Sequence, residues 1–204
     1  MRRYKVIILR TLQLIAMLGD EEMRVELKNI VGDDYWCYGL NESDFDYILR
    51  LVEDFISCRQ RELEEKKEKV ILEHPDPEIH GEIISDNAHY YWVDVQYLWQ
   101  FCLWRLQGIL EGLIVYSFLP KKPEKKMIGI KSKLDVLRKS GYSISGDEYE
   151  ELINWANLRN ALSHAPPEQY RPGTLTKDDV KEYKSFIEGL CVRWRCQEKK
   201  VKNA

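Results

Sequence analysis

The stretch VQYLWQFCLWRLQGILEGLIVYSF, residues 95–118, is the longest apolar segment of the 204-residue chain and decides its fold. When successive residues are placed about 100° apart on a helical wheel, apolar side chains fill most of the circumference. Four polar side chains share one narrow seam: Gln96, Gln100, Gln107 and Glu111. The pattern predicts the central helix of a bundle, expected over residues 88–118. Its charged residues argue against a membrane span.

The rest of the chain also favours helices. Glycine (11) and proline (7) are sparse, and apolar residues recur mostly at helical spacing, which predicts an all-α, antiparallel helical bundle. The formal net charge of -3 provides no global basic field for a nucleic acid, so an RNA-binding role would need a local patch.

The cysteines and the N-terminus bear on localisation. The chain has five cysteines, an odd number, and no CxxC pair, so we expect neither a disulfide framework nor a zinc site. A reducing, cytoplasmic location fits this pattern. The N-terminal stretch MRRYKVIILRTLQLIAML superficially resembles a signal peptide, but Arg10 and Gln13 interrupt it and no small-residue cleavage site follows. We interpret it as a core helix, with no membrane partner.

Helix boundaries follow from turn and capping residues. The expected helices cover about residues 3–18, 20–31, 88–118, 128–140 and 146–164. A further long helix is expected to start at Ser43 and to continue through the charged stretch 59–69, and a last helix is expected to follow Thr176. Two capping boxes, Ser145 with Glu148 and Thr176 with Asp179, open the last two helices. Prolines and a glycine within EHPDPEIHGEIISDNAH, residues 73–89, predict a linker. We therefore expect an N-terminal helical region over 1–75 and a second bundle over 76–204, or one continuous domain.

The stretch WANLRNALSHAPPEQY, residues 155–170, holds an arginine in an unexpected place. On the wheel of the 146–164 helix, Arg159 lies in the middle of the apolar arc, with Ser163 beside it. An unpaired guanidinium buried there would cost several kcal/mol. Arg159 is therefore expected to pair with a carboxylate such as Glu111, to line a water-filled cleft, or to face a subunit interface. All three alternatives remain open from the sequence.

His164 ends the same helix, because Pro166 disfavours a helical conformation at Ala165. A helix C-terminus favours an imidazolium, and such a histidine can exchange a proton near neutral pH. An adjacent arginine can hold a phosphate through two hydrogen bonds. Together, Arg159 and His164 suit phosphodiester cleavage without a metal, in which a 2′-hydroxyl is the nucleophile. The alternative is structural, with Arg159 paired and His164 capping the helix.

The string Arg159-Asn160-x-x-x-His164 resembles the R-x4–6-H motif of HEPN domains, including the polar residue after the arginine. A long apolar helix, a short helix and a loop precede the motif, and TLTKDDVKEYKSFIEGL resembles the closing helix of such domains. The resemblance covers roughly residues 86–195. HEPN toxins paired with minimal nucleotidyltransferases often have a tyrosine two residues after the histidine, where this chain has Pro166.

The resemblance implies a HEPN-like helical bundle, with additional N-terminal helices here, that forms a homodimer and brings two motifs into one cleft. Many HEPN proteins are metal-independent endoribonucleases, often toxins or antiviral defence proteins. By this resemblance His164 is the acid or base, Arg159 stabilises the phosphate, and Asn160 orients one of them or the substrate. RNA and an antitoxin protein are the implied partners, and no cofactor is expected. One alternative is a non-catalytic helical module that binds RNA or protein, and a remoter one is a nucleotide-binding domain.

Further residues have less specific patterns. Lysines cluster in and after a loop and provide a candidate contact to the RNA backbone, with a solvated loop as the commoner interpretation: Lys121, Lys122, Lys125, Lys126, Lys131 and Lys133. Ser163 is a further candidate for substrate binding, and Glu111 a supporting partner of Arg159. Aromatic residues between Tyr90 and Trp104 can stack on bases but at helical spacing more often form a core or a dimer interface. No metal-ligand motif is present in the sequence.

Overall fold

The computed structural model of this chain describes residues 41–119, 129–164 and 174–202. These residues belong to the second of two units into which the chain divides, between Gly39 and Leu40. The expected helices over 3–18 and 20–31, and with them the additional N-terminal helices, lie outside the described residues. The expected boundary at residues 75 and 76 falls within the second unit.

The described part of the chain consists of helices and short connecting segments and contains no strand, which confirms the predicted all-α bundle. Its α-helices are α3 (Ser43–Glu73), α4 (Pro77–Leu113), α5 (Gly129–Lys139), α6 (Gly146–His164) and α7 (Lys177–Lys202). A π-helical turn, Ile114–Phe118, continues α4. The bounds of α5 and α6 agree closely with the predicted helices.

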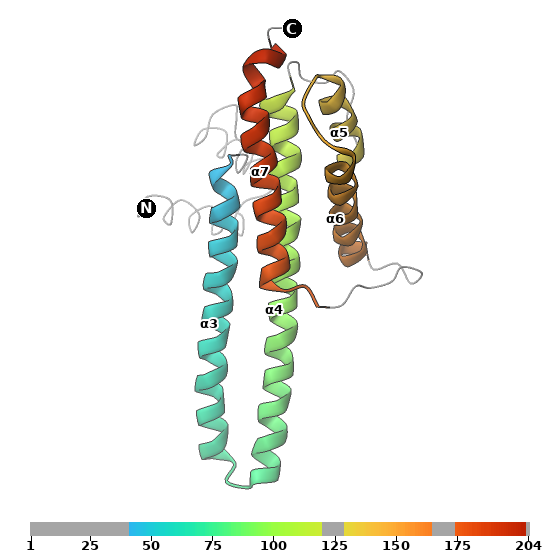
Figure 1. Ribbon diagram of the computed structural model, residues 1–204. Coiled ribbons are helices and arrows are strands. Elements are labelled where there is room, and N and C mark those ends of the chain that lie inside the picture. Colours follow the sequence, from blue (N-terminus) through green and yellow to red (C-terminus); the bar gives the residue numbers. More distant parts are fainter. Residues whose placement is uncertain (1–40, 120–128, 165–173, 203–204) are drawn as a thin grey trace, which may run out of the picture. The chain divides into compact units, whose positions relative to one another are not determined.

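Helices α3 and α4 form a long antiparallel hairpin (Figure 1). Only residues 74–76 separate them, so the predicted linker over 73–89 is wrong. Pro77 is the first residue of α4, where its missing N–H costs no hydrogen bond, and the Asp76 carboxylate accepts a hydrogen bond from the Glu78 N–H over 2.9 Å. The residues that predicted a linker therefore start a helix.

The directions of α6 and α7 follow from their contacts with α4. The Tyr142 hydroxyl, just before α6, donates to the Phe118 carbonyl over 2.8 Å, whereas Arg159 near the end of α6 reaches Gln107. Helix α6 therefore runs antiparallel to α4. Before α7, the Leu175 N–H donates to the Gln96 amide oxygen over 3.0 Å, and α7 then follows the direction of α4 (Figure 1).

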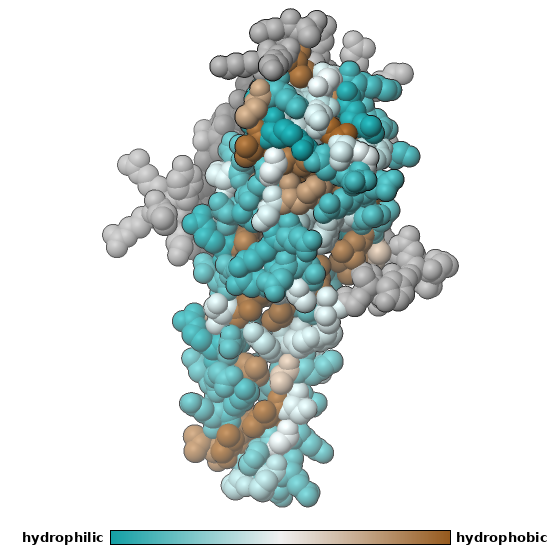
Figure 2. All heavy atoms as spheres, viewed as in Figure 1, coloured by the Kyte–Doolittle hydropathy of each residue, from teal (hydrophilic) through white to brown (hydrophobic). Residues whose placement is uncertain are grey.

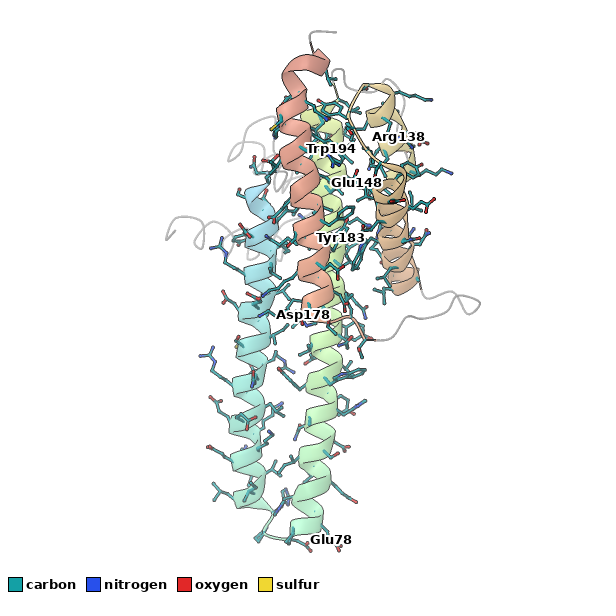
Figure 3. The ribbon with its side chains drawn as sticks, viewed as in Figure 1. Glu78, Arg138, Glu148, Asp178, Tyr183 and Trp194 are labelled. Carbon is teal, nitrogen blue, oxygen red and sulfur yellow. The ribbon has the colours of Figure 1, made fainter. Side chains whose placement is uncertain are left out.

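Apolar side chains from all five helices form one core. Trp194 of α7, labelled in Figure 3, is fully buried, and its ring packs edge-on against Phe118 with 5.4 Å between ring centroids. Its indole N–H donates to the Ser143 carbonyl over 3.1 Å, so the segment before α6 is fixed to α7. On α4 the buried residues begin only at Trp99. The core therefore lies beside the second half of α4, where α6 also packs.

Candidate functional site

Helix α6 carries the predicted motif, and the capping box that the sequence predicted fixes its start. The Ser145 N–H donates to the Glu148 carboxylate over 2.8 Å, and the Glu148 N–H donates to the Ser145 hydroxyl over 3.1 Å. Arg193 of α7 forms an ion pair with Glu148 at 2.7 Å. Although burial opposes the shift, these partners lower the pKa of Glu148 below its ordinary value. The beginning of α6 is thereby fixed to α7.

Helix α6 buries the face on which the arginine of the motif lies. Leu152 and Ala156 are buried on this face, and Arg159 follows one turn after Ala156. Residues three and four apart share a helix face, so this packing directs Arg159 toward α4. The Arg159 side chain is 22% exposed, which places it at the edge of the core.

One edge of the Arg159 guanidinium is bound within the chain. Its Nε donates to Oε1 of Gln107 over 2.8 Å, and its Nη2 donates to Oε1 of Glu111 over 3.4 Å. Both acceptors belong to the polar seam of α4. No described residue accepts a hydrogen bond from Nη1 of Arg159. The arginine is therefore paired with Glu111, as one of the three alternatives from the sequence required, and its orientation is fixed.

Glu111 also joins a second cation to the site. Its other carboxylate oxygen forms an ion pair with Lys133 of α5, and both side chains are largely buried, with exposed fractions of 14% for Glu111 and 15% for Lys133. Lys133 is thus not part of a solvated lysine cluster. One carboxylate between two cations leaves a formal charge of +1 beside the pocket, and this charge suits an anionic ligand.

Gln107 is buried beside a tyrosine of α7. Gln107 and Tyr183 are both fully buried, and Tyr183 lies on α7 at the level of α6 (Figure 3). Burial raises the pKa of the Tyr183 hydroxyl, and an interaction with Gln107 partly opposes the rise. Within the described residues, the Tyr183 hydroxyl and Gln107 Nε2 complete no hydrogen bond of good geometry. The Tyr183 ring also packs on Trp155, with 4.8 Å between centroids. Gln107 is therefore enclosed by α7 and α6.

A surface pocket of about 180 Å³ lies beside the arginine, between α4 and α6. Its lining residues are Gln100, Phe101, Trp104, Arg159, Leu162 and Ser163. Half of these residues are polar, and Arg159 is the charged one. The pocket therefore combines a fixed cation with two aromatic rings on one accessible surface.

Two of the other predicted site residues, Asn160 and Ser163, have described side chains on α6. Asn160 is exposed, and Ser163 lines the pocket while its hydroxyl donates to the Arg159 carbonyl over 2.9 Å. His164 is the last residue of α6, and its side chain lies outside the described residues. The four loop lysines assigned to substrate binding also lie outside the described residues: Lys121, Lys122, Lys125 and Lys126.

The structure brings further residues to this site that the sequence pattern did not identify as functional. Gln107 and Gln100 were recognised as part of a polar seam, but not as the arginine's partner and a pocket residue. Phe101 and Trp104 belonged to an aromatic series interpreted mainly as core. The available signal was the seam itself, because a buried polar stripe on a central helix requires polar partners on the neighbouring helix.

The described residues carry neither a metal site nor a membrane-spanning helix. In the described ranges, no three or more His, Cys, Asp and Glu side chains are grouped so as to hold a metal ion. No helix within these ranges combines the length and apolar character needed to cross a bilayer. Comparisons of the chain with protein-family models, with curated proteins and with solved structures found no match.

Proposed function

We propose that this chain is a metal-independent endoribonuclease of the HEPN type that acts as a homodimer in the cytoplasm. Arg159 stabilises the scissile phosphate, His164 transfers a proton as acid or base, and Asn160 orients one of these groups or the substrate. The loop lysines contribute contacts to the RNA backbone. A role as a toxin held by an antitoxin protein, or in antiviral defence, is consistent with this chemistry.

The observation that carries the proposal is the setting of Arg159. Its Nε and Nη2 are bound to Gln107 and Glu111, while Nη1 has no acceptor among the described residues and the side chain lines an open pocket. A guanidinium fixed before the substrate arrives stabilises developing negative charge without reorganisation. This geometry supports an anion-binding role more than a purely internal ion pair.

The proposed reaction needs no metal, because the nucleophile belongs to the substrate. The 2′-hydroxyl oxygen forms a bond to phosphorus, and the bond from phosphorus to the 5′-oxygen breaks. One proton leaves the 2′-hydroxyl and one reaches the 5′-oxygen, so the products are a 2′,3′-cyclic phosphate and a 5′-hydroxyl. General acid–base catalysis by a positioned histidine typically contributes 10²–10⁴-fold to such a step.

One observation favours the second candidate, a non-catalytic helical module that binds RNA or protein. Glu111 lies between Arg159 and Lys133, so it gives the arginine a structural partner inside its own protomer. An arginine that only joins α6 to α4 would explain the same contacts. The two candidates differ in whether RNA is cut.

The deciding experiment incubates purified protein with mixed RNA in excess EDTA and identifies the products. We expect cyclic phosphate termini, a loss of about 10²-fold or more in rate for Arg159→Ala and for His164→Ala, and no cleavage of fully 2′-O-methylated RNA. Arg59→Ala is the matched control, because Arg59 also pairs with carboxylates but belongs to α3 and does not line the pocket. Equal activity in wild type and both variants would show that a contaminating nuclease cuts the RNA, and would favour the non-catalytic binding module.

A further inference from the structure

Two aromatic side chains are exposed on the wall of the pocket that Arg159 lines. Phe101 is 42% and Trp104 is 49% exposed, although both lie within the most apolar part of α4. Their ring centroids are 6.3 Å apart and their planes are tilted by 46°. Covering such rings contributes a large hydrophobic free energy, so two open rings beside a cation form a favourable contact surface for a flat ligand.

The size and chemistry of the pocket restrict the ligand. Its volume of about 180 Å³ is well below the roughly 300–1,000 Å³ of pockets for drug-sized molecules, so it accommodates one flat ring system rather than a whole nucleotide. The Gln100 side-chain amide, also on the wall, offers both a donor and an acceptor to the edge of such a ring. Every nucleobase presents a π-face for stacking and a polar edge.

Arg159 connects this aromatic wall to a phosphate. The same guanidinium that lines the pocket has its Nη1 unbonded among the described residues, and the adjoining Lys133–Glu111–Arg159 group has a formal charge of +1. A phosphate at Nη1 and a base on the rings would belong to the same or neighbouring nucleotides. A second copy of the chain is the less favoured occupant, because three of the six lining residues are polar and one is charged.

We propose that Phe101 and Trp104, with Gln100, form a subsite for one unpaired nucleobase beside the phosphate that Arg159 binds. This inference rests on the proposed function and names its substrate class, which is single-stranded RNA. A base inside a duplex is stacked on both faces and paired along one edge, so it has no free face for the aromatic wall.

The test measures binding separately from cleavage. A fluorescently labelled single-stranded RNA, fully 2′-O-methylated so that it cannot be cut, is titrated with protein and followed by anisotropy. The same strand annealed to its complement is titrated in parallel. Trp104→Ala is compared with Trp92→Ala, a tryptophan on the same helix that is 48% exposed and does not line the pocket. Circular dichroism and size-exclusion chromatography check that each variant folds and keeps its oligomeric state.

We expect Trp104→Ala to raise the Kd for the single strand about tenfold, Trp104→Phe to restore most of the affinity, and Trp92→Ala to change it less than twofold. The duplex should bind at least tenfold more weakly than the single strand. Equal Kd values for the two tryptophan variants, or for duplex and single strand, would overturn the subsite. Dissociation of a dimer by Trp104→Ala alone would also overturn it and identify the rings as a protein interface.

The two proposals can fail independently. Unmodified RNA cleaved at the same rate by Trp104→Ala and wild type would overturn the subsite and leave the ribonuclease intact. Binding that depends on Trp104, with no cleavage of unmodified RNA, would overturn the ribonuclease and support the subsite in a binding module.

Discussion

The two halves of the α3–α4 hairpin have the same secondary structure but different surroundings. Near the turn, over residues 57–94, α3 and α4 pack against each other with no other described helix beside them, and we call this part the hairpin arm (Figure 1). Leu63 is the buried residue described there. Beyond the arm, α6 and α7 pack on α4, and eight of its side chains from Trp99 to Leu113 are buried.

Ion pairs join the two helices in the arm, whereas buried apolar side chains join the helices of the bundle. Arg59 of α3 forms ion pairs with Glu62 and with Asp94 of α4, and these carboxylates raise the pKa of Arg59. Apolar side chains remain exposed toward the turn, as the brown patch at the lower end of Figure 2 shows; they include Ile71, Leu72 and Ile79. Two helices alone cannot enclose a core, so length and helicity in this chain do not imply local stability.

The largest expected difference between the two halves comes from truncating one leucine in each. Leu106→Ala removes a fully buried side chain of α4 and should lower the free energy of unfolding by about 2–5 kcal/mol. Leu72→Ala, at a side chain that is 82% exposed on the arm, should change it by less than about 0.5 kcal/mol. Urea denaturation followed by circular dichroism measures both, and equal losses would show that the arm has a core of its own.

A carboxylate in each half provides the next comparison. Glu111→Gln leaves Arg159 and Lys133 without their counter-charge at a largely buried site, and we expect a loss of about 1–3 kcal/mol. Asp94→Asn weakens an ion pair that solvent screens, and should cost less than about 1 kcal/mol. The same denaturation experiment compares them, and a larger loss for Asp94→Asn would contradict the assignment of Glu111 as the arginine's buried anchor.

Helix caps sharpen the comparison at a smaller scale. Ser145→Ala removes one bond of the α6 capping box and should destabilise the whole bundle by about 1 kcal/mol. Asp76→Ala removes the cap of α4 at the arm turn and should speed amide exchange near residues 77–80 without lowering global stability. Hydrogen exchange with peptide resolution separates these outcomes. Protection lost throughout α4 on Asp76→Ala would show that arm and bundle unfold together.

The smallest effect is the pH dependence due to Glu148. Burial opposes ionisation, but the Ser145 N–H and Arg193 lower the pKa of this carboxyl below 4.5, so its ionised form stabilises the folded state. That contribution is fully present above about pH 4.5 and is lost as the pH falls through the lowered pKa. Glu148→Gln should therefore lose less stability than wild type between pH 5 and about pH 3. Identical acid profiles would show that the carboxyl is not linked to folding.

Helix boundaries were predictable where local chemistry decides them. The capping boxes at Ser145 and Thr176 predicted the starts of α6 and α7, and both form the reciprocal bonds expected. The start of α4 was misplaced by about ten residues because Pro77 and Gly81 were interpreted as breakers. Pro77 is harmless at a first helical position, and Gly81 in a helix costs only about 1 kcal/mol, which the hairpin tolerates.

The candidate site was only partly predictable, because its parts come from different helices. The wheel placed Arg159 on an apolar face and required a partner, and Glu111 was among the candidates. Which aromatic residues stay open was not predictable, since Trp99 is buried and Trp104 is exposed on the same helix, according to which side of α4 the neighbouring helices cover. That choice is made by tertiary packing.

Helix α4 belongs to both halves, and its continuity has a geometric consequence. Pro77 and Trp104 lie on one unbroken helix and are 27 positions apart, which sets a spacing of about 40 Å at 1.5 Å per residue. A molecule held at the tip of the arm would lie at a fixed distance and in a fixed direction from Arg159. Removing two full turns from each arm helix would shorten the distance from the tip of the arm to the pocket and leave the pocket itself unaltered.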